Sequence, residues 1–340
     1  MGDSQVYSQL NTRYLMLTIR DPYGRPVTQA RISLNSSMEC NFSCDFCHKE
    51  GIKEASNGVI RAEEVERITR ILTNFGISII KLTGGEPLLR KDIVEIVGRI
   101  NKLGVKEISL STNGTHLSRL ASKLKDNGLK RVNVSLHTLN REKFKILTGT
   151  NRLNETIESI KKSIDAGLLP VKMNTTVMRG LNDGEIDKLI EFSRRIGGSK
   201  TNVLQLIELV PNESLFYEKY SISLDSIEND LRNRAIASTE RISHRRPKYE
   251  LENGVTVEIV RPMHNTKFCI GCNRMRITYD GKFKSCLLQN NNHIDFLSSM
   301  RSGADDAKIT EIFKKAISIR EPFFKIENKK LTDTRYKPIK

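Results

Sequence analysis

Tryptophan and long apolar runs are both absent from this chain of 340 residues. No apolar stretch approaches the roughly 18 residues that cross a bilayer, and the run Ile77 to Ile80 is already broken by Ser78. No basic segment followed by an apolar one opens the chain, and Val6 stands where a myristoylation signal has Ser or Thr. We therefore expect a cytoplasmic protein with no membrane partner.

Acidic residues are outnumbered, because 56 Lys and Arg face 40 Asp and Glu, which gives a formal charge of +16. This excess favours polyanions such as nucleotides or RNA, although lysines spread over helix surfaces give the same sum. Cysteine is scarce and falls into two groups of three. A disulfide framework needs pairs and an oxidising compartment, so the two triplets favour two metal or cluster sites.

Short β-branched runs alternate with amphipathic helical segments between about residues 30 and 210. Repeated βα units predict an α/β fold, a partial (βα)6 TIM-like barrel of parallel strands with its ligands at the carboxyl ends of the strands. The predicted strands cover residues 31–34, 78–82, 107–111, 131–135, 171–178 and 203–210, and glycines at 76, 104, 128, 167 and 197 mark helix ends.

The rhythm changes after residue 210, so we divide the chain into three parts. These are an N-terminal extension (1–29), the barrel (30–211) and a C-terminal region (212–340) that packs against the barrel and carries the second cysteine group. Within the last part the sequence predicts helices over 224–237 and 308–319 and a strand over 254–260, and a basic stretch covers 241–248.

The first cysteine triplet follows the first predicted strand and consists of Cys40, Cys44 and Cys47. Three thiolates at this spacing can bind three irons of a 4Fe-4S cubane and leave the fourth iron open to a small molecule. The alternative is a zinc site completed by His48.

The second triplet offers the same two alternatives and consists of Cys269, Cys272 and Cys286. It forms either an auxiliary cubane with an open iron or a zinc site completed by His264 or His293. Arg274 and Arg276 follow two residues apart, so on a strand they point to the same side and offer forked donors for phosphate oxygens.

The CxxxCxxC spacing resembles the radical S-adenosylmethionine (SAM) superfamily, and Thr83-Gly84-Gly85-Glu86-Pro87 after the second strand is similar to its GGEP motif. The resemblance implies a first 4Fe-4S cluster that binds SAM and cleaves it to a 5′-deoxyadenosyl radical. It also implies contacts to SAM from Phe46, Gly85 and Ser135.

The order of four segments resembles one family more closely, the GTP 3′,8-cyclases of molybdenum cofactor biosynthesis. These segments are Gly24-Arg-Pro, His48-Lys-Glu-Gly51, KLTGGEPLLR from residue 81, and CxxCNRMR followed by the last cysteine. The resemblance implies a lyase that removes the ribose 3′ hydrogen of GTP and joins C3′ to C8, giving (8S)-3′,8-cyclo-7,8-dihydroguanosine 5′-triphosphate. A second 4Fe-4S cluster would hold the purine, and the implied GTP contacts are Arg31, Lys81, Thr112, Lys172, Arg274 and Arg276.

The resemblance also implies partners: a reductant such as a ferredoxin or flavodoxin, and the next pathway enzyme, cyclic pyranopterin monophosphate synthase. One alternative is a related radical SAM enzyme that modifies a peptide or tRNA, and another is a non-enzymatic iron–sulfur or zinc protein. The NRMR segment argues against the former and against a nucleic-acid partner, while the GGEP run beside an open-iron triplet argues against the latter.

The chain departs from the family pattern at several positions, among them Val210 in place of a Met and two extra residues between Arg31 and Cys40. Gln205 stands where many members have an arginine that reaches the phosphates, and His137 stands where an acidic residue is frequent. We expect His137 to lie behind the site or to face solvent. The chain ends Arg335-Tyr-Lys-Pro-Ile-Lys340 and so lacks the Gly-Gly tail typical of the family.

Overall fold

The structure of the chain is a computed structural model that describes residues 18–52, 58–211, 215–263 and 265–323. The C-terminal hexapeptide lies outside these ranges, as does His264. Within them, no helix combines the length and the apolar character that crossing a membrane requires.

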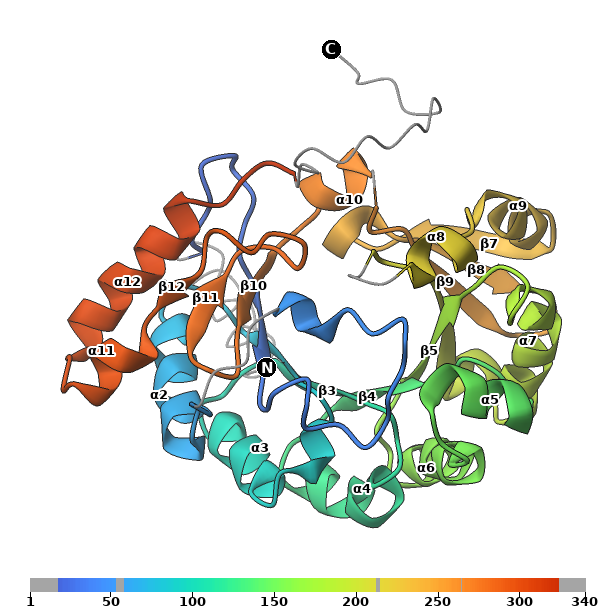
Figure 1. The fold of residues 1–340 in the computed structure, drawn as a ribbon, viewed down its shortest axis with the longest axis horizontal. Helices are drawn as coiled ribbons and strands as arrows, with labels where there is room; N and C mark the ends of the chain where they lie inside the picture. Colours follow the sequence, from blue (N-terminus) through green and yellow to red (C-terminus); the bar gives the residue numbers. More distant parts are fainter. Residues whose placement is uncertain (1–17, 53–57, 212–214, 264, 324–340) are drawn as a thin grey trace, which may run out of the picture.

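Strands in the described ranges form one sheet that curves around the centre of the molecule (Figure 1). The order across the sheet is β12-β11-β10-β1-β2-β3-β4-β5-β6-β9-β8-β7. Strands β1 to β6 are parallel neighbours in sequence order, which confirms the predicted α/β partial barrel. The bounds are β1 Gln29–Ser33, β2 Ile79–Thr83, β3 Glu107–Thr112, β4 Arg131–Ser135, β5 Val171–Val177, β6 Asn202–Glu208, β7 Ala235–Glu240, β8 Pro247–Leu251, β9 Thr256–Val260, β10 Arg274–Ile277, β11 Lys282–Lys284 and β12 Ile294–Asp295.

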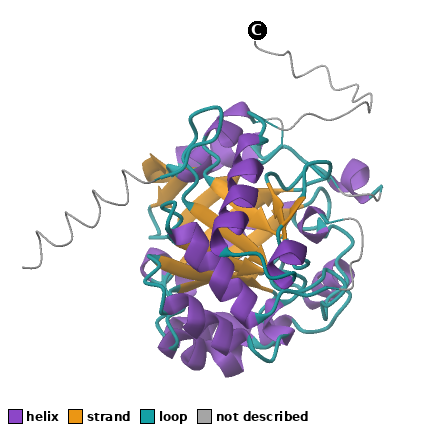
Figure 2. Cartoon of the chain, turned by 90° about the vertical axis from the view of Figure 1, so that its left-hand side faces the viewer, coloured by secondary structure: helices purple, strands orange, loops and turns teal. Residues whose placement is uncertain are grey.

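Helices cover the outside of this sheet, as Figures 1 and 2 show. Their buried faces follow the apolar spacing read from the sequence; α2, for example, buries Val65, Ile68 and Leu72 against the sheet. The helices are α2 Ala62–Thr73, α3 Ile93–Asn101, α4 Leu117–Asp126, α5 Arg141–Thr148, α6 Leu153–Asp165, α7 Ile186–Arg195, α8 Phe216–Tyr220, α9 Asp225–Asn233, α10 Thr266–Ile270, α11 Leu297–Arg301 and α12 Asp306–Ser318; the 3₁₀ turns are η1 Lys49–Gly51, η2 Pro87–Leu89, η3 Asp183–Glu185, η4 Gly198–Lys200 and η5 Ser243–Arg245.

The C-terminal region extends the sheet at both edges rather than only packing against it. β9 pairs in parallel with β6, and β10 pairs in parallel with β1. The predicted strand over 254–260 is β9 and the predicted helix over 308–319 is α12. The helix expected over 224–237 ends earlier, at Asn233, because the chain from Ala235 pairs with β8 as the antiparallel strand β7.

Strand register determines which side chains share one level of the barrel interior. Across β10, β1, β2, β3 and β4 the aligned positions are Arg276, Arg31, Lys81, Ser109 and Arg131. Their neighbours in sequence point to the other face of the sheet, because side chains alternate along a strand. Ile32, Ile80 and Leu82 accordingly lie buried in the core beneath the helices. The barrel interior is therefore polar and cationic on this side.

Candidate active site

One cavity of about 400 Å³ opens at the carboxyl ends of the parallel strands, a size within the range of small-molecule sites. Both cysteine triplets line it, although about 220 residues of sequence lie between them. The structure thus brings together all fifteen site residues predicted from the sequence: Cys40, Cys44, Cys47, Cys269, Cys272, Cys286, Phe46, Gly85, Ser135, Arg31, Lys81, Thr112, Lys172, Arg274 and Arg276. Their individual roles remain predictions.

The loop of the first triplet is fastened to the ends of β2 and β3. The backbone N–H of Glu86 donates to the carbonyl of Glu39 at 2.9 Å, and Asn113 Nδ2 donates to Asn41 Oδ1 at 2.7 Å. A Cβ added to Gly85 would lie 2.4 Å from the carbonyl oxygen of Glu39, so no larger residue fits there. The GGEP segment therefore sets the position of the cysteine loop.

Glu86 itself is buried and joins two strand ends. Its carboxylate accepts hydrogen bonds from Thr112 Oγ1 at 2.7 Å, from the backbone N–H of Asn113 at 2.7 Å and from that of Leu88 at 3.0 Å. Burial raises the pKa of Glu86 to about 7. The hydroxyl of Thr112 is thus engaged by Glu86, and its contact with GTP stays a prediction.

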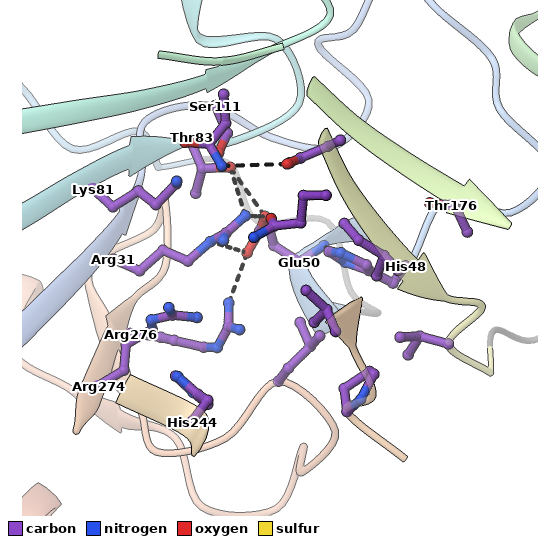
Figure 3. Close-up of a pocket in the computed structure, with 18 of the residues that line it drawn as sticks. Arg31, His48, Glu50, Lys81, Thr83, Ser111, Thr176, His244, Arg274 and Arg276 are labelled. Atoms are coloured by element: carbon purple, nitrogen blue, oxygen red, sulfur yellow. Dashed lines mark hydrogen bonds and ion pairs between the residues drawn. The ribbon is translucent and has the colours of Figure 1, made fainter. Parts of the chain in front are cut away.

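Arg31, Lys81, Arg274 and Arg276 form a cationic wall of the cavity, and Glu50 lies at its centre (Figure 3). The sequence analysis did not predict this role for Glu50. Its carboxylate accepts hydrogen bonds from Arg31 at 2.5 and 3.1 Å, from Arg276 at 2.9 Å and from Thr83 Oγ1 at 3.0 Å. Burial acts to raise the pKa of Glu50, but the guanidinium groups of Arg31 and Arg276 outweigh it and hold this pKa well below its usual range. The carboxylate occupies the position that an anionic ligand of these arginines would take.

The backbone under Glu50 has an uncommon conformation. Lys49, Glu50 and Gly51 have φ values of 48°, 51° and 68°, which all lie in the left-handed region. A Cβ on Gly51 would lie 2.0 Å from the carbonyl oxygen of Leu287, so the turn also packs tightly against the loop of the second triplet. Left-handed non-glycine residues cost about 1–3 kcal/mol each and persist where surrounding contacts fix them. Here the paired arginines supply those contacts.

Lys81 and Arg274 are cations without acidic partners in the described part of the chain. Burial lowers the pKa of Lys81, and the positive charges of Arg31, Arg131 and Arg274 lower it further. Burial and the positive charge of Arg276 likewise lower the pKa of Arg274. Holding unpaired, partly buried cations side by side is costly unless an anion joins them. This wall of the cavity therefore favours a multiply charged anion.

A second cationic group lies on the opposite wall, around the fully buried carboxylate of Glu258. Lys172 Nζ donates to it, Arg246 Nε lies 3.0 Å from Oε1, and Arg241 Nη1 lies 3.5 Å from Oε1. Burial lowers the pKa of Lys172 to about 7, against the opposing effect of Glu258. Gln205 Nε2 is buried nearby with no hydrogen-bond partner among the described residues. The basic stretch 241–248 thus supplies two cations that the sequence analysis left without a role.

His137 and Phe46 form the side of the cavity near the first triplet. Their rings meet edge to face with centroids 4.7 Å apart. Burial lowers the pKa of His137 to about 4, and its Nδ1 accepts a hydrogen bond from the backbone N–H of Thr176 at 3.1 Å. The part of our prediction that let His137 face solvent is wrong, since the ring is buried beside Phe46.

His244 also lines the cavity and was not predicted. Its ring packs on Phe268 with centroids 4.4 Å apart, and its backbone N–H donates to the carbonyl of Gly271 at 2.8 Å. Its φ of 63° again places a non-glycine residue in the left-handed region. A lone histidine in a basic stretch carries no sequence signal for this position, because the contact is made with a loop distant in sequence.

The described residues do not assemble a site for a single metal ion around either triplet. Burial raises the pKa values of Cys40, Cys44 and Cys47, so their thiolates need adjacent positive charge such as cluster iron. In the described ranges no three His, Cys, Asp or Glu side chains gather closely enough to hold one metal ion. His48 Nδ1 instead accepts from the Glu50 backbone at 3.1 Å. The zinc alternatives therefore gain no support from the described residues.

Comparisons with known proteins agree with this site. Residues 34–193 match the Radical SAM superfamily, and residues 202–326 match the family called Molybdenum Cofactor Synthesis C. A "Probable GTP 3′,8-cyclase" of Thermococcus kodakarensis is 49% identical over 312 residues, which cover 90% of this chain and 99% of that protein. Another from Pyrococcus abyssi is 46% identical over 311 residues, which cover 89% and 99%.

The fold has relatives among solved structures. The crystal structure of Streptococcus suis SuiB bound to its precursor peptide SuiA superposes with a TM-score of 0.59 at 16% identity. The match covers 78% of this chain and 61% of SuiB, so the chain spans less than two thirds of that protein. At this identity the likeness concerns the fold alone. The two family matches and the relatives above show that the chain belongs to the radical SAM superfamily and, within it, to the GTP 3′,8-cyclase family.

Proposed function

We propose that this chain is a GTP 3′,8-cyclase, a lyase that holds SAM and GTP between two 4Fe-4S clusters. Radical SAM membership implies one such cluster and SAM. The first triplet would hold that cluster, and the second triplet would hold an auxiliary cluster beside the purine. The division at residues 29 and 211 remains part of this proposal.

With the first cluster and SAM bound, the site would supply a 5′-deoxyadenosyl radical, which takes hydrogen from ribose C3′ of GTP so that C3′ bonds to guanine C8. The chain's own side chains bind and orient. Arg31, Arg274 and Arg276 present forked donors to phosphate oxygens. Lys81 adds charge from β2, the strand next to β1, and Lys172 adds charge from β5 on the opposite wall.

One observation carries the proposal: a single cavity contains both cysteine triplets and a group of largely buried cations that the chain neutralises only in part. A triphosphate matches this excess of positive charge, and guanine and SAM then lie toward the two cysteine groups. A peptide or tRNA substrate explains neither Lys81 nor Arg274, whose partial burial side by side without an acidic partner among the described residues favours a compact anion.

The test is an anaerobic reaction of the reconstituted, reduced chain with SAM and GTP that carries deuterium at C3′, followed by mass spectrometry. We expect 5′-deoxyadenosine that has gained the deuterium, together with a product isomeric with GTP. GTP deuterated at C2′ is the matched control and should transfer none. Cleavage of SAM with GTP untouched would refute the substrate, and a Cys44→Ala protein that still cleaves SAM would refute the first cluster assignment.

The electron balance implies a partner. Each turnover consumes two electrons and one proton, one electron to cleave SAM and one to reduce the cyclised radical. We propose a one-electron donor such as a ferredoxin or flavodoxin, and the next pathway enzyme, cyclic pyranopterin monophosphate synthase, as the recipient of the product. A cytoplasmic location belongs to the same proposal.

A further inference from the structure

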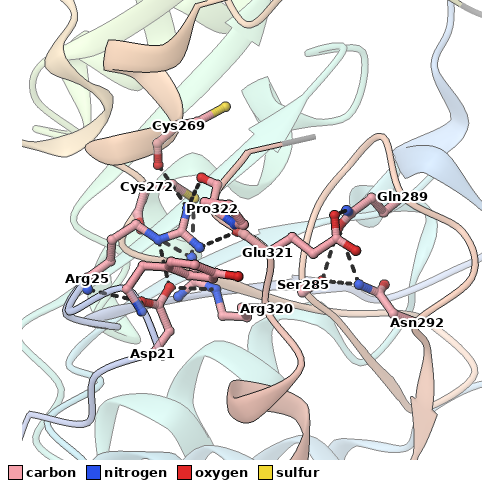
Figure 4. Close-up of polar contacts among 11 residues, drawn as sticks. Asp21, Arg25, Cys269, Cys272, Ser285, Gln289, Asn292, Arg320, Glu321 and Pro322 are labelled. Carbon is pink, nitrogen blue, oxygen red and sulfur yellow. Dashed lines mark hydrogen bonds and ion pairs between the residues drawn. The ribbon is translucent and has the colours of Figure 1, made fainter. Parts of the chain in front are cut away.

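Two arginines from opposite ends of the chain hold the loop that carries Cys269 and Cys272 (Figure 4). Arg25 Nη1 donates to the carbonyl of Cys269 at 3.1 Å. Arg320 Nη2 donates to the carbonyl of Cys272 at 3.1 Å and to its Sγ at 3.6 Å. Both arginines are at least nine-tenths buried. The CxxC segment is thus held by one residue that precedes β1 and one that follows α12.

Asp21 links the two arginines. Its carboxylate lies 2.6 Å from Arg25 Nε and 3.5 Å from Arg320 Nε, and it is itself buried. Arg25 also donates hydrogen bonds to the backbone carbonyls of Glu321 at 2.5 Å and Pro322 at 2.6 Å. One carboxylate therefore balances two guanidinium groups, which leaves positive charge directly behind the second cysteine pair.

Arg320 has one guanidinium nitrogen that donates no hydrogen bond to the described residues. Its Nη1 is buried and has no hydrogen-bond partner among the described residues, although the side chain lines the cavity. An unpaired guanidinium nitrogen costs free energy wherever burial removes it from water. A negatively charged group beside Cys272 would remove that cost, and the position of Arg320 is compatible with such a group.

We propose that Arg320 is a positioning residue of the second cluster, which fixes Cys272 and raises the cluster's reduction potential through its hydrogen bond to Sγ and its charge. This rests on the proposed second cluster. Hydrogen bonds to ligating sulfur and nearby positive charge stabilise the reduced, more negative state of an iron–sulfur cluster. The mechanism of substrate binding does not use Arg320, so its arrangement serves the cysteine loop.

The test uses the full chain with Cys40, Cys44 and Cys47 replaced by Ala, so that only the second cluster forms. Iron content and a redox titration followed by electron paramagnetic resonance are measured after anaerobic reconstitution. We expect Arg320→Gln to retain iron and to shift the potential downward, with a smaller shift for Arg320→Lys. Arg301→Gln, which removes a guanidinium paired with Glu64 outside the cavity, is the control and should leave the potential unchanged.

Each outcome decides the question. An unchanged potential in Arg320→Gln overturns the proposal. Should Arg320→Gln lose its iron, the comparison moves to Arg320→Lys, where a downward shift supports the proposal and no shift overturns it. Absence of iron from the parent protein without the first triplet overturns the second cluster and the role of Arg320 together, and in that case the mass-spectrometric assay with GTP still stands as a separate test of the cyclase.

Discussion

Replacing Glu50 by Gln should strengthen the binding of GTP, although it removes four hydrogen bonds to a carboxylate. Glu50 neutralises Arg31 and Arg276 in the cavity, and a triphosphate must share or replace it. At an effective dielectric constant of about 20, a carboxylate about 5 Å from a phosphate charge opposes it by about 3 kcal/mol. Allowing for rearrangement of the arginines, we expect about tenfold to 100-fold tighter binding.

The same substitution should destabilise the protein in the absence of GTP. Removing one partner of a buried ion pair costs about 3–5 kcal/mol, because the remaining charges lose their counter-ion. The pKa of Glu50 is lowered on folding, so its stabilisation is present above its ordinary pKa of about 4.3 and is lost as the pH falls through the lowered value. Thermal unfolding with and without GTP measures both effects. The melting temperature of Glu50→Gln should lie below that of the wild type, and GTP should reduce this difference.

Anaerobic calorimetry with GTP, GDP and guanosine separates repulsion between Glu50 and the phosphates from effects of the substitution that do not depend on phosphate charge. The gain in affinity should be greatest for GTP, smaller for GDP and absent for guanosine. Glu64→Gln is the matched control, since Glu64 accepts hydrogen bonds from Arg301 at 2.7 and 2.9 Å outside the cavity. Equal or weaker GTP binding by Glu50→Gln would refute the reasoning and make Glu50 a scaffold for the arginines.

Three further predictions concern the same cavity. Arg274→Gln combined with Arg276→Gln should weaken GTP binding about 100-fold or more while SAM cleavage continues, because charge-assisted hydrogen bonds contribute about 1.5–3 kcal/mol each; calorimetry and a 5′-deoxyadenosine assay measure this. Gly85→Ala should reduce iron content and melting temperature, since its Cβ would lie 2.3 and 2.4 Å from two backbone oxygens just before Cys40. GTP affinity should fall as the pH rises from about 7 to 9, because Lys172, whose pKa burial lowers to about 7, loses its proton; Lys172→Arg should flatten this profile.

Each of these has a contrary result. Unchanged GTP affinity in the double arginine variant would remove the phosphate-binding role from β10. A Gly85→Ala protein with full iron content would show that the GGEP turn does not set the cysteine loop. Identical pH profiles for the wild type and Lys172→Arg would assign any titration to another group.

The parallel core could be predicted from the sequence because its signals are local. Each of the six strands is a short β-branched run bounded by turns, and the glycines at 76, 104, 128, 167 and 197 all have positive φ after a helix. The helix over 224–237 was predicted too long, because nothing within that segment reports that residues 235–240 find a partner in β8. Tertiary pairing overrides local preference there.

The cysteines and the pair Arg274 and Arg276 were predictable because their spacing is local, whereas Arg31, Lys81 and Lys172 were named only through the resemblance to the cyclase family. The counter-ions were not predictable. Glu50 and Glu258 are ordinary acidic residues in the sequence, and only the fold places them among arginines from other strands. Arg246 and His244 illustrate the same limit, because their position depends on a loop that packs against residues about 30 positions away.

The pairing of β10 with β1 determines how far apart the two cysteine groups lie. Cys40 follows β1 closely and Cys272 precedes β10 by two residues, and these two strands are hydrogen-bonded neighbours in one ladder. Backbone hydrogen bonds between these two strands therefore hold the two cysteine groups at a set spacing. A chain cut after residue 211 would leave the outer edges of β1 and β6 bare and prone to associate with other chains.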